Sequence, residues 1–552
     1  MMNKRTRLTP FHFLIWSLCI GLPLLGACNS NNKKAIAGPQ PTLDSVYITE
    51  QMNAEPAFKD QLLWAKNFYR ERNFQLGWFK NHELVPQAAK MLDIIAKAGE
   101  EGLDPKDYQI KDFDTLFEEF KKNRKDSVKR NELEKQIDVA LSGTYFNWAS
   151  DYYRGLVVPK ENKEIEWDVK RNKIKLHKAL LTVLGERESK YPYADFAPLH
   201  PEYTRLKKAF AKYRAIKAKG GWKTVQDVTL KPGQNSPAVA ALRSRFSVLA
   251  DTAGNNTSTV YDQNLVASVK AFQQQVGLNP TGIVDADTRR ELNVPVDARL
   301  RQIVINMERW RWIPKSFEAD YLMVNIPEYR LHVFEKGQER MNMNVIVGKT
   351  LNQTPIFSDR MEYVVLAPYW NVPINILKNE YASKFAANPG LVETLNMEVV
   401  TSKGDPVDPG SIDWMSVDEG NWKYILRKKP GPKNDLGDVK FIFPNTNDIY
   451  LHDTPHDQLF SQAKRGFSHG CVRVEKPIQL ATYLLRNVPG WDQSKIQSTI
   501  AVGEEKFVPL KQKLPVYLVY FTAWADDAGN VSFRDDIYGH DKVLASQYFS
   551  KL

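Results

Sequence analysis

The feature that most limits the fold is a change in the spacing of apolar residues near residue 320. Before it, apolar and aromatic side chains recur every three or four residues, the spacing of one helix face. One such series is Leu133, Ile137, Leu141, Tyr145 and Trp148. After it, short β-branched and aromatic runs such as YLMVNIP and MEYVVLAP are separated by Gly and Pro. Because 552 residues are too many for one core, the sequence predicts a multidomain α+β protein, helical first and mainly β afterwards.

The N-terminus has the pattern of an export signal. Basic residues in MMNKRTR precede an apolar run that ends on the small residues Gly26 and Ala27, so residues 1–27 are predicted to be a signal peptide. His12, Gly21 and Pro23 interrupt the run. A membrane-spanning helix needs about 20 apolar residues, so this reading is disfavoured.

The end of this signal, Leu25-Gly26-Ala27-Cys28, resembles a bacterial lipobox. The resemblance implies that Cys28 carries a lipid, that residues 28–45 tether the chain to a membrane, and that the protein is exported to the cell envelope. Asn29 after the lipidated cysteine is compatible with outer-membrane sorting. Ordinary cleavage beside an unmodified cysteine is the alternative. Either cleavage removes Cys19, so Cys471 becomes the only free thiol and no intrachain disulfide framework is possible.

The formal net charge of +11 falls to +8 when the three basic residues of the signal are removed. This excess suits an anionic envelope polymer or membrane surface, or simply a solvated basic face. The basic run KKNRKDSVKRNELEKQ has no interleaved aromatic residues for base stacking, so no nucleic-acid partner is predicted. The oligomeric state is left open.

Two helical domains are expected before the β region. The first, a helical scaffold, covers residues 46–225. The second, residues 230–294, has three helices, with starts predicted at Ser236-Pro237, at Asp262 and near Asp285. Its text VKAFQQQVGLNPTGIVDADTRREL resembles the three-helix peptidoglycan-binding domain of cell-wall enzymes. The resemblance implies binding to wall glycan, and a spacer bundle that binds nothing is the alternative.

The predicted β domain, residues 318–490, holds two stretches with reactive side chains. In DIYLHDTP, alternation places Ile449 and Leu451 in the core and leaves Tyr450 and His452 on the accessible face.

In the second stretch, SHGCVR, an extended backbone puts His469, Cys471 and Arg473 on one face and points Val472 to the core. Gly470 permits a turn, and the amides around it could cradle an oxyanion.

A thiol with a pKa near 8.5 needs a histidine to take its proton or stabilise its thiolate, and both His452 and His469 are available. A buried inert thiol is the alternative reading of Cys471. A metal hydrolase built on His452 and His456 is disfavoured, because Pro455 breaks a helical pair and HExxH is absent. No metal or cofactor is predicted.

At this point the motifs resemble a known family. His452-Asp453-Thr454, followed after a gap by Ser468-His469-Gly470-Cys471-Val472-Arg473, resembles the signature of the L,D-transpeptidase catalytic domain of bacterial cell-wall enzymes. The order of scaffold, peptidoglycan-binding module and catalytic domain also resembles the large envelope-anchored members of that family.

The resemblance implies a role for each matching residue. Cys471 would be the nucleophile and His452 the general base, with the backbone or side chain of Asp453 orienting the imidazole. The N–H groups of Gly470 and Cys471 would form the oxyanion hole, Arg473 would bind a carboxylate or hold the loop, and His469 would play a supporting part. Four further residues are candidates for substrate binding: Ser468, Tyr450, Trp370 and Asn371. Core packing is the alternative for Trp370.

The reaction implied is attack on the third residue of a peptidoglycan tetrapeptide stem, release of D-alanine, and transfer of the acyl group to an amine in a 3-3 cross-link. Carbapenems, which acylate the cysteine of this family, are expected to modify Cys471. A lid over the site is predicted at about residues 376–424, with Trp414 and Trp422, and residues 491–552 form a C-terminal segment. An L,D-carboxypeptidase and a non-catalytic wall-binding lipoprotein are the alternatives.

Overall fold

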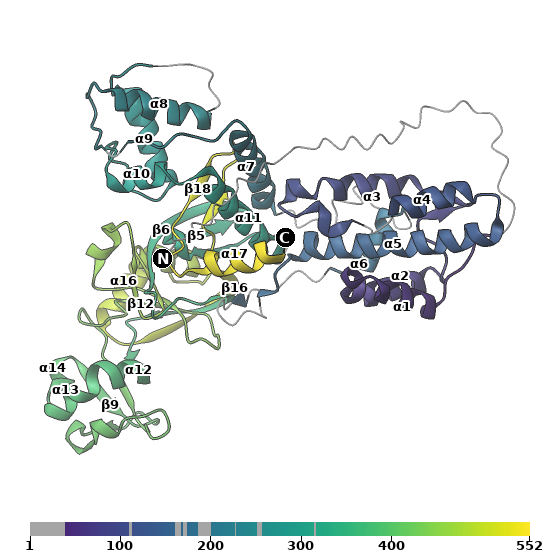
Figure 1. Ribbon diagram of the computed structural model, residues 1–552. Coiled ribbons are helices and arrows are strands. Elements are labelled where there is room, and N and C mark those ends of the chain that lie inside the picture. The colour runs from purple at the N-terminus through teal and green to yellow at the C-terminus, as the bar shows by residue number, and fades with distance from the viewer. Residues whose placement is uncertain are drawn as a thin grey trace, which may run out of the picture.

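The structure is a computed structural model that describes residues 39–551, except for 110–112, 160–166, 169–173, 186–199, 227, 251–256 and 314–315. An elongated helical region extends to one side of a β-rich body, while a three-helix module and a small inserted unit lie at two other ends of it (Figure 1). The predicted signal peptide and Cys28 lie outside the described residues, as does most of the tether. Within the described part of the chain, no helix is both long and apolar enough to cross a membrane.

The helical region is organised around one long helix. Its helices are α1 (Ser45–Ala54), α2 (Leu62–Glu71), α3 (Pro86–Ala96), α4 (Phe113–Lys122), α5 (Ser127–Arg154) and α6 (Leu176–Val183). Helix α5 begins after Asp126, whose carboxylate accepts hydrogen bonds from the backbone N–H groups of Val128 and Lys129. All five side chains of the predicted apolar face, from Leu133 to Trp148, are buried, which confirms that face.

The three-helix module contains α8 (Pro237–Ala250), α9 (Gln263–Gln275) and α10 (Ala286–Leu292), and it has a hydrophobic cluster of its own. The predicted caps are present. The Ser236 Oγ accepts from the Ala238 N–H at 3.2 Å, and Asp262 and Asp285 cap α9 and α10. Helices α7 (Pro201–Ala218) and α11 (Val296–Trp312) connect this module with the rest of the chain and pack on each other.

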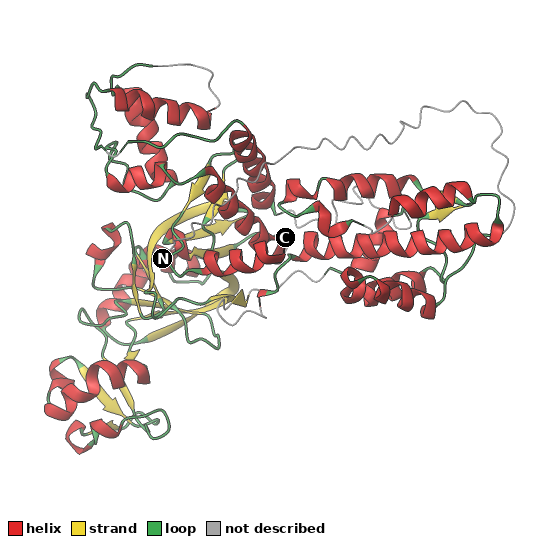
Figure 2. Cartoon of the chain, in the orientation of Figure 1, coloured by secondary structure: helices red, strands yellow, loops and turns green. Residues whose placement is uncertain are grey.

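The β-rich body is one large sheet that closes on itself (Figure 2). Its strand order is β12, β13, β15, β6, β5, β4, β16, β7, and β7 pairs again with β12. The main strands are β4 (Tyr321–Asn325), β5 (Arg330–Glu335), β6 (Gln338–Gly348), β7 (Ile356–Leu366), β12 (Val439–Ile442), β13 (Leu451–His452), β14 (Gly466–Ser468), β15 (Val472–Val474) and β16 (Lys506–Val519). The short β14 pairs with β6, and helices α15 (Pro477–Leu485) and α16 (Gln493–Val502) follow β15. The predicted mainly-β domain is therefore present.

The C-terminal residues are part of this body rather than a separate segment after residue 490. Strand β16 lies between β4 and β7, and its register shifts between Pro509 and Leu514. Polar residues in the middle of its sequence, KFVPLKQKLPVYLV, interrupt the alternation of apolar residues from which a strand is predicted. After it come the hairpin β17 (Ala523–Ala525) and β18 (Val531–Phe533), and helix α17 (His540–Lys551), which packs on α11.

The helical region also contributes to the sheet. Its short strand β3 (Trp167–Asp168) pairs in parallel with β7, so that Trp167 lies beside Ile356. Trp167 is buried, and its ring packs edge-on against Trp312 of α11 at 5.2 Å. The helical region and the sheet thus share one continuous hydrophobic core.

The inserted unit carries a separate core. Its strands β8 (Trp370–Asn371), β9 (Met397–Val400), β10 (Pro406–Val407) and β11 (Ile425–Lys428) form a four-stranded sheet, beside α12 (Ile374–Ile376), α13 (Ala382–Ala387) and α14 (Leu391–Thr394). Its hydrophobic cluster includes Trp414 and extends from Trp370 to Leu436, beyond the limits of about 376–424 expected from the sequence. Core residues on both sides of those limits place the boundaries of the unit near Trp370 and Leu436.

Candidate active site

The thiol lies in a sharp loop between two short strands. β14 ends at Ser468 and β15 begins at Val472, so that residues 469–471 form the connection. Val472 and Val474 are fully buried, while His469 is exposed and Cys471 and Arg473 are half-buried. This alternation confirms the predicted faces. Gly470 has a φ of +119°, a conformation open to glycine and strained for other residues.

His452 lies on the strand next to this loop. β13 pairs in parallel with β15, with Leu451 opposite Val472 and His452 opposite Arg473. The prediction that His452 lies on an accessible face is wrong: the residue is only 5% exposed. The ring of Tyr450 lies 5.7 Å from its imidazole, and Lys440 of β12 is its partner on the other side. Burial, together with the charges of Arg473 and Lys440, lowers the pKa of His452 to about 3.

Asp453 holds the imidazole through its backbone. His452 Nδ1 lies 2.5 Å from the Asp453 carbonyl oxygen, which accepts a hydrogen bond from Nδ1–H. This tautomer leaves Nε2 free to act as a base. The Asp453 carboxylate instead accepts from the N–H groups of Asp438 at 2.8 Å and Thr454 at 2.7 Å. Burial raises the pKa of this carboxyl to about 6. Asp453 was expected to orient His452 through either its backbone or its side chain, and in the structure it is the backbone carbonyl that contacts the imidazole.

The thiol is surrounded by polar groups but is not paired with the histidine. Cys471 Sγ lies 3.9 Å from the Asp448 carbonyl oxygen. Burial raises the pKa of the thiol, against the opposing effect of hydrogen bonds from the backbone and side chain of Tyr450 and of the Lys440 and Arg473 charges. Within the described residues, no hydrogen bond joins Sγ to His452. The resting site therefore holds a neutral thiol beside a neutral imidazole.

The predicted oxyanion donors are partly engaged within the loop itself. The Gly470 N–H donates to Ser468 Oγ at 3.2 Å, and the Ser468 hydroxyl donates to the Cys471 carbonyl oxygen at 2.5 Å. Ser468 is only 2% exposed, so its hydroxyl shapes the loop in this structure rather than facing the solvent. The Gly470 carbonyl oxygen accepts from Thr354 Oγ1 at 2.7 Å.

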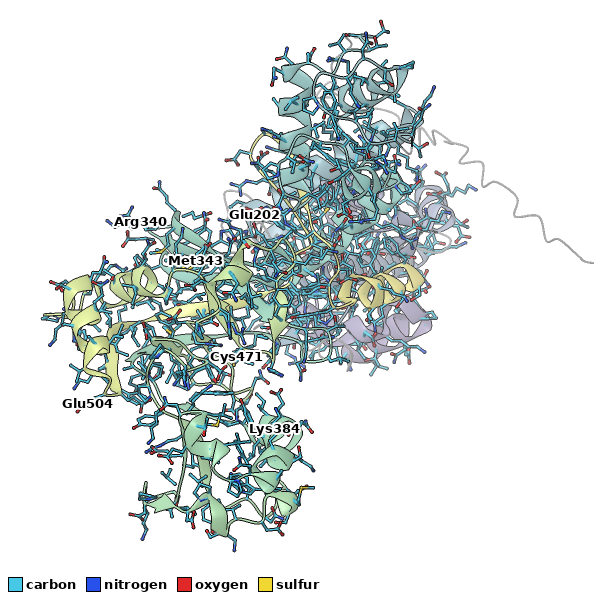
Figure 3. All side chains as sticks on the ribbon, turned by 90° about the vertical axis from the view of Figure 1, so that its left-hand side faces the viewer. Glu202, Arg340, Met343, Lys384, Cys471 and Glu504 are labelled. Atoms are coloured by element: carbon cyan, nitrogen blue, oxygen red, sulfur yellow. The ribbon has the colours of Figure 1, made fainter. Side chains whose placement is uncertain are left out.

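The inserted unit lies next to the thiol loop. In Figure 3, Cys471 is on the side of the sheet that faces the segment carrying Lys384. His469 Nε2 lies 3.0 Å from a carboxylate oxygen of Glu380, in the π-helical turn Leu377–Tyr381. Trp370 is buried in the core of the unit, against which Tyr450 also packs, while Asn371 is exposed. The structure thus brings Tyr450 and Trp370 together beside Cys471.

Five residues at this site were not predicted from the sequence. Lys440 points toward the site because it alternates with the buried Val439 and Phe441 on β12, and its ammonium lies 3.9 Å from the centre of the Tyr450 ring. This alternation is readable in VKFIFPN, but its pairing with His452 is not. Gly437 lies directly against the Asp453 carboxylate. Glu380, Thr354 and Tyr538 are distant in sequence and give no local signal. Tyr538 supports Thr354, since its hydroxyl accepts from the Thr354 N–H at 3.2 Å and donates to the Gly348 carbonyl oxygen at 2.6 Å.

Comparison with protein families assigns three parts of the chain. Residues 319–503 match the model described as L,D-transpeptidase catalytic domain. Residues 64–210 match a scaffold domain, and residues 235–292 match the model described as "Putative peptidoglycan binding domain".

Individual relatives point the same way. A protein of Haemophilus influenzae described as "Putative L,D-transpeptidase" is 34% identical over 290 residues, which are 52% of this chain and 56% of that protein. The match thus spans about half the length of this curated relative.

Two solved structures are also similar. An L,D-transpeptidase of Xylanimonas cellulosilytica aligns at 15% identity with a TM-score of 0.17, covering 54% of this chain and 100% of that one. A structure described as the Ldtfm-avibactam carbamoyl enzyme aligns at 10% identity with a TM-score of 0.16, covering 57% and 98%. Scores this low lend no support to a shared arrangement of the aligned chains. The β-rich body, at residues 319–503, is thus the part of the chain that matches the L,D-transpeptidase catalytic domain.

Proposed function

We propose that the protein is a peptidoglycan L,D-transpeptidase that uses Cys471 as its nucleophile. The observation that carries the proposal is that Cys471 lies directly before β15, which pairs in parallel with the strand β13 that holds a neutral, backbone-oriented His452 in the matched domain. Cys471 Sγ attacks the carbonyl carbon of the third residue of a tetrapeptide stem. Its proton passes to His452 Nε2 and then to the departing amine of D-alanine as the C–N bond breaks.

The second half of the reaction transfers the acyl group. An amine of a neighbouring stem attacks the thioester carbonyl, the C–S bond breaks, and a proton from the amine returns to the thiolate through His452. The N–H groups of Gly470 and Cys471 stabilise the oxyanion once substrate displaces the contact of the Gly470 N–H with Ser468. His469 supports the loop through Glu380.

Arg473 is the proposed carboxylate-binding residue. Its Nε is buried without a hydrogen-bond partner among the described residues, and burial lowers the pKa of its guanidinium. A buried donor with no partner favours an incoming acceptor, and a substrate carboxylate supplies one. Tyr450, Trp370 and Asn371 line the side of the site next to the inserted unit and would contact the stem peptide.

The inserted unit is the proposed lid. A thioester reacts with water as well as with amines, so exclusion of water favours transfer over trimming. The contact of His469 Nε2 with the Glu380 carboxylate at 3.0 Å and the packing of Tyr450 against the core of the inserted unit connect the lid to the thiol loop. An L,D-carboxypeptidase that uses the same Cys471 is the second candidate function, and it differs only in taking water as the acceptor.

The other parts of the chain would hold the enzyme at its polymer. We propose that residues 230–294 bind peptidoglycan, that residues 46–225 are the scaffold, and that residues 318–490 with β16 form the catalytic domain. Lipidation of Cys28 would anchor the chain to a membrane of the cell envelope.

The test is product analysis with purified disaccharide tetrapeptide, comparing wild type with Cys471→Ala. The transpeptidase proposal expects 3-3 cross-linked dimers and free D-alanine with wild type, and neither with the variant. Formation of tripeptide without cross-linked dimers would show that the protein is an L,D-carboxypeptidase rather than a transpeptidase. If neither wild type nor Cys471→Ala releases D-alanine although both bind peptidoglycan, the protein is a non-catalytic wall-binding protein. A carbapenem should add its mass to wild type and not to Cys471→Ala.

A further inference from the structure

A cavity of about 400 Å³ lies between the three-helix module and the β-rich body. Its walls come from the end of α9 and the turn after it, from α10, from the start of β5, and from the segments before β14 and after β18. The segment before β14 leads through Gly466–Ser468 directly into the loop of Cys471. Ligand-binding cavities in proteins commonly have this size and lie at such junctions.

Three arginines of this cavity have no carboxylate partner among the described residues: Arg330, Arg465 and Arg534. Arg465, only 8% exposed, donates to the carbonyl oxygens of Val345, Gln462 and Tyr329 and to Asn344. Arg534 donates to the carbonyl oxygens of Gln275 and Phe533, and Arg330 donates to the Asn342 side chain. Carbonyl oxygens satisfy hydrogen bonds, but they do not neutralise charge.

Each carboxylate in the cavity wall forms a close contact with a basic side chain other than these three arginines. Glu291 pairs with Arg299 at 2.7 Å, Asp535 with Lys464 at 2.9 Å, and Glu328 with His332 at 3.0 Å. Burial lowers the pKa of His332, but its hydrogen bonds to the Glu328 and Glu339 carboxylates and their charges outweigh burial and raise it to about 9, so His332 is charged at neutral pH. The cavity wall carries net positive charge, because its five basic residues (Arg290, Arg330, Lys464, Arg465 and Arg534) outnumber its three carboxylates, although the charge of Glu328 partly offsets that of Arg534.

The arginines also repel one another. Burial lowers the pKa of Arg465 to about 10, and the charges of Arg330 and Arg534 add to this lowering, while Tyr329 and Glu475 oppose it. An anion between them would relieve the repulsion and gain charge-assisted hydrogen bonds, which are about twice as strong as neutral ones. Like charges held together in a cavity are a common mark of a binding site.

The module is fitted closely to one of these arginines. Gly277 has a φ of +75°, and a Cβ there would come within 2.9 Å of Arg534 Cδ. The Arg534 guanidinium donates to the Gln275 carbonyl oxygen at 2.7 Å. Arg534 thus touches the module and the cavity together, so a ligand in the cavity would contact both domains.

We propose that this cavity binds a carboxylate of a peptidoglycan stem peptide, holding the polymer between the three-helix module and the thiol loop. This inference rests on the proposed function, and it names a second peptide-binding site away from Cys471. Arg330 is its main anion ligand, because it is less buried than Arg465 and its side chain is held by a single neutral amide.

The test uses the chain from Asn29 carrying Cys471→Ala, with a disaccharide tetrapeptide as probe. Hydrogen exchange locates binding in residues 463–465 and 535–537, and calorimetry measures affinity. Arg330→Gln should weaken binding about tenfold and abolish protection of these residues. Arg340→Gln is the matched control, since Arg340 is an exposed arginine on the adjacent β6. Arg534→Gln should act as Arg330→Gln does, provided that its thermal unfolding matches that of the parent.

Three results would overturn the inference. Equal protection in Arg330→Gln and Arg340→Gln would exclude the cavity, and equal binding of a probe with amidated carboxyl groups would exclude carboxylate recognition. Protection of these residues from hydrogen exchange by inorganic phosphate but not by the peptide would show that the cavity binds a phosphate group rather than a peptide carboxylate. Acylation of Cys471 in the wild-type chain, measured in parallel, separates the two proposals. Acylation without protection of the cavity rejects only this site, whereas protection without acylation rejects only the proposed activity.

Discussion

The substitution Gly437→Ala should disable the site without touching the thiol or the imidazole. Gly437 has a φ of +60°, and a Cβ at this position would lie 2.3 Å from Asp453 Oδ2. Ordinary contact begins at 3.4 Å, so the carboxylate must move by about 1 Å. That carboxylate is fixed by the N–H groups of Asp438 and Thr454, and the carbonyl of the same Asp453 orients His452.

The magnitude follows from two contributions. An alanine in the left-handed region costs about 1–2 kcal/mol, and weakening one hydrogen bond to a charged group adds about 1.5–3 kcal/mol. We therefore expect Gly437→Ala to lower the free energy of unfolding by about 3–4 kcal/mol. A displacement of about 1 Å at a catalytic base is enough to slow acylation about 100-fold.

The matched control is Gly503→Ala. Gly503 also has a positive φ, of +77°, but no atom lies within 4 Å of the added Cβ. It should lose only about 1–2 kcal/mol and keep the wild-type rate. The assay is the rate at which tetrapeptide acylates each folded variant, followed by intact mass. Equal rates in the two variants would refute the role assigned to Asp453 in orienting His452.

Three further predictions concern the thiol, the loop and the scaffold. Because the proposed nucleophile is a protonated thiol whose pKa is raised, and its base is a neutral His452 whose pKa is lowered to about 3, both groups keep their reactive protonation state across neutral pH, and the acylation rate should stay level from about pH 5 to pH 8; a rate that falls steadily as the pH drops below about 7 would contradict this mechanism. Thr354→Val removes the donor to the Gly470 carbonyl oxygen and the acceptor of the Gly348 N–H, and should slow acylation about tenfold, whereas Thr354→Ser should restore it. Asp138→Ala leaves the buried N–H groups of Gly77 and Trp78 without their acceptor and should lower the free energy of unfolding in denaturant by about 3–5 kcal/mol; a loss under 1 kcal/mol would show that water replaces the carboxylate.

Local patterns in the sequence were enough to predict the elements that carry the site. Spacing of three and four identified the buried face of α5, and Ser236, Asp262 and Asp285 marked the helix starts of the module. Alternation in SHGCVR correctly separated the half-buried Cys471 from the buried Val472.

The exposure of His452 could not be predicted in this way. Alternation assigns a face, but it does not say what covers that face. Here Tyr450, Lys440 and Arg473 surround the imidazole, and two of these come from other strands.

Long-range partners were equally hidden. The C-terminal Tyr538 supports Thr354, and Thr354 in turn holds Gly470, although these residues are separated by more than 100 positions. Strand β16 was hidden because polar residues interrupt its apolar pattern at the register shift. The predicted boundary at residue 490 is not a structural one, because β16 pairs with β4 and β7 in the same sheet.

The most direct test of the central claim is the intact mass of the chain from Asn29 after mixing with a disaccharide tetrapeptide. The proposed mechanism predicts a transient gain equal to the substrate less D-alanine on wild type, absent in Cys471→Ala and strongly reduced in His452→Ala. An adduct of that mass on Cys471→Ala, or D-alanine release by that variant at the wild-type rate, would contradict the assignment of Cys471 as the nucleophile.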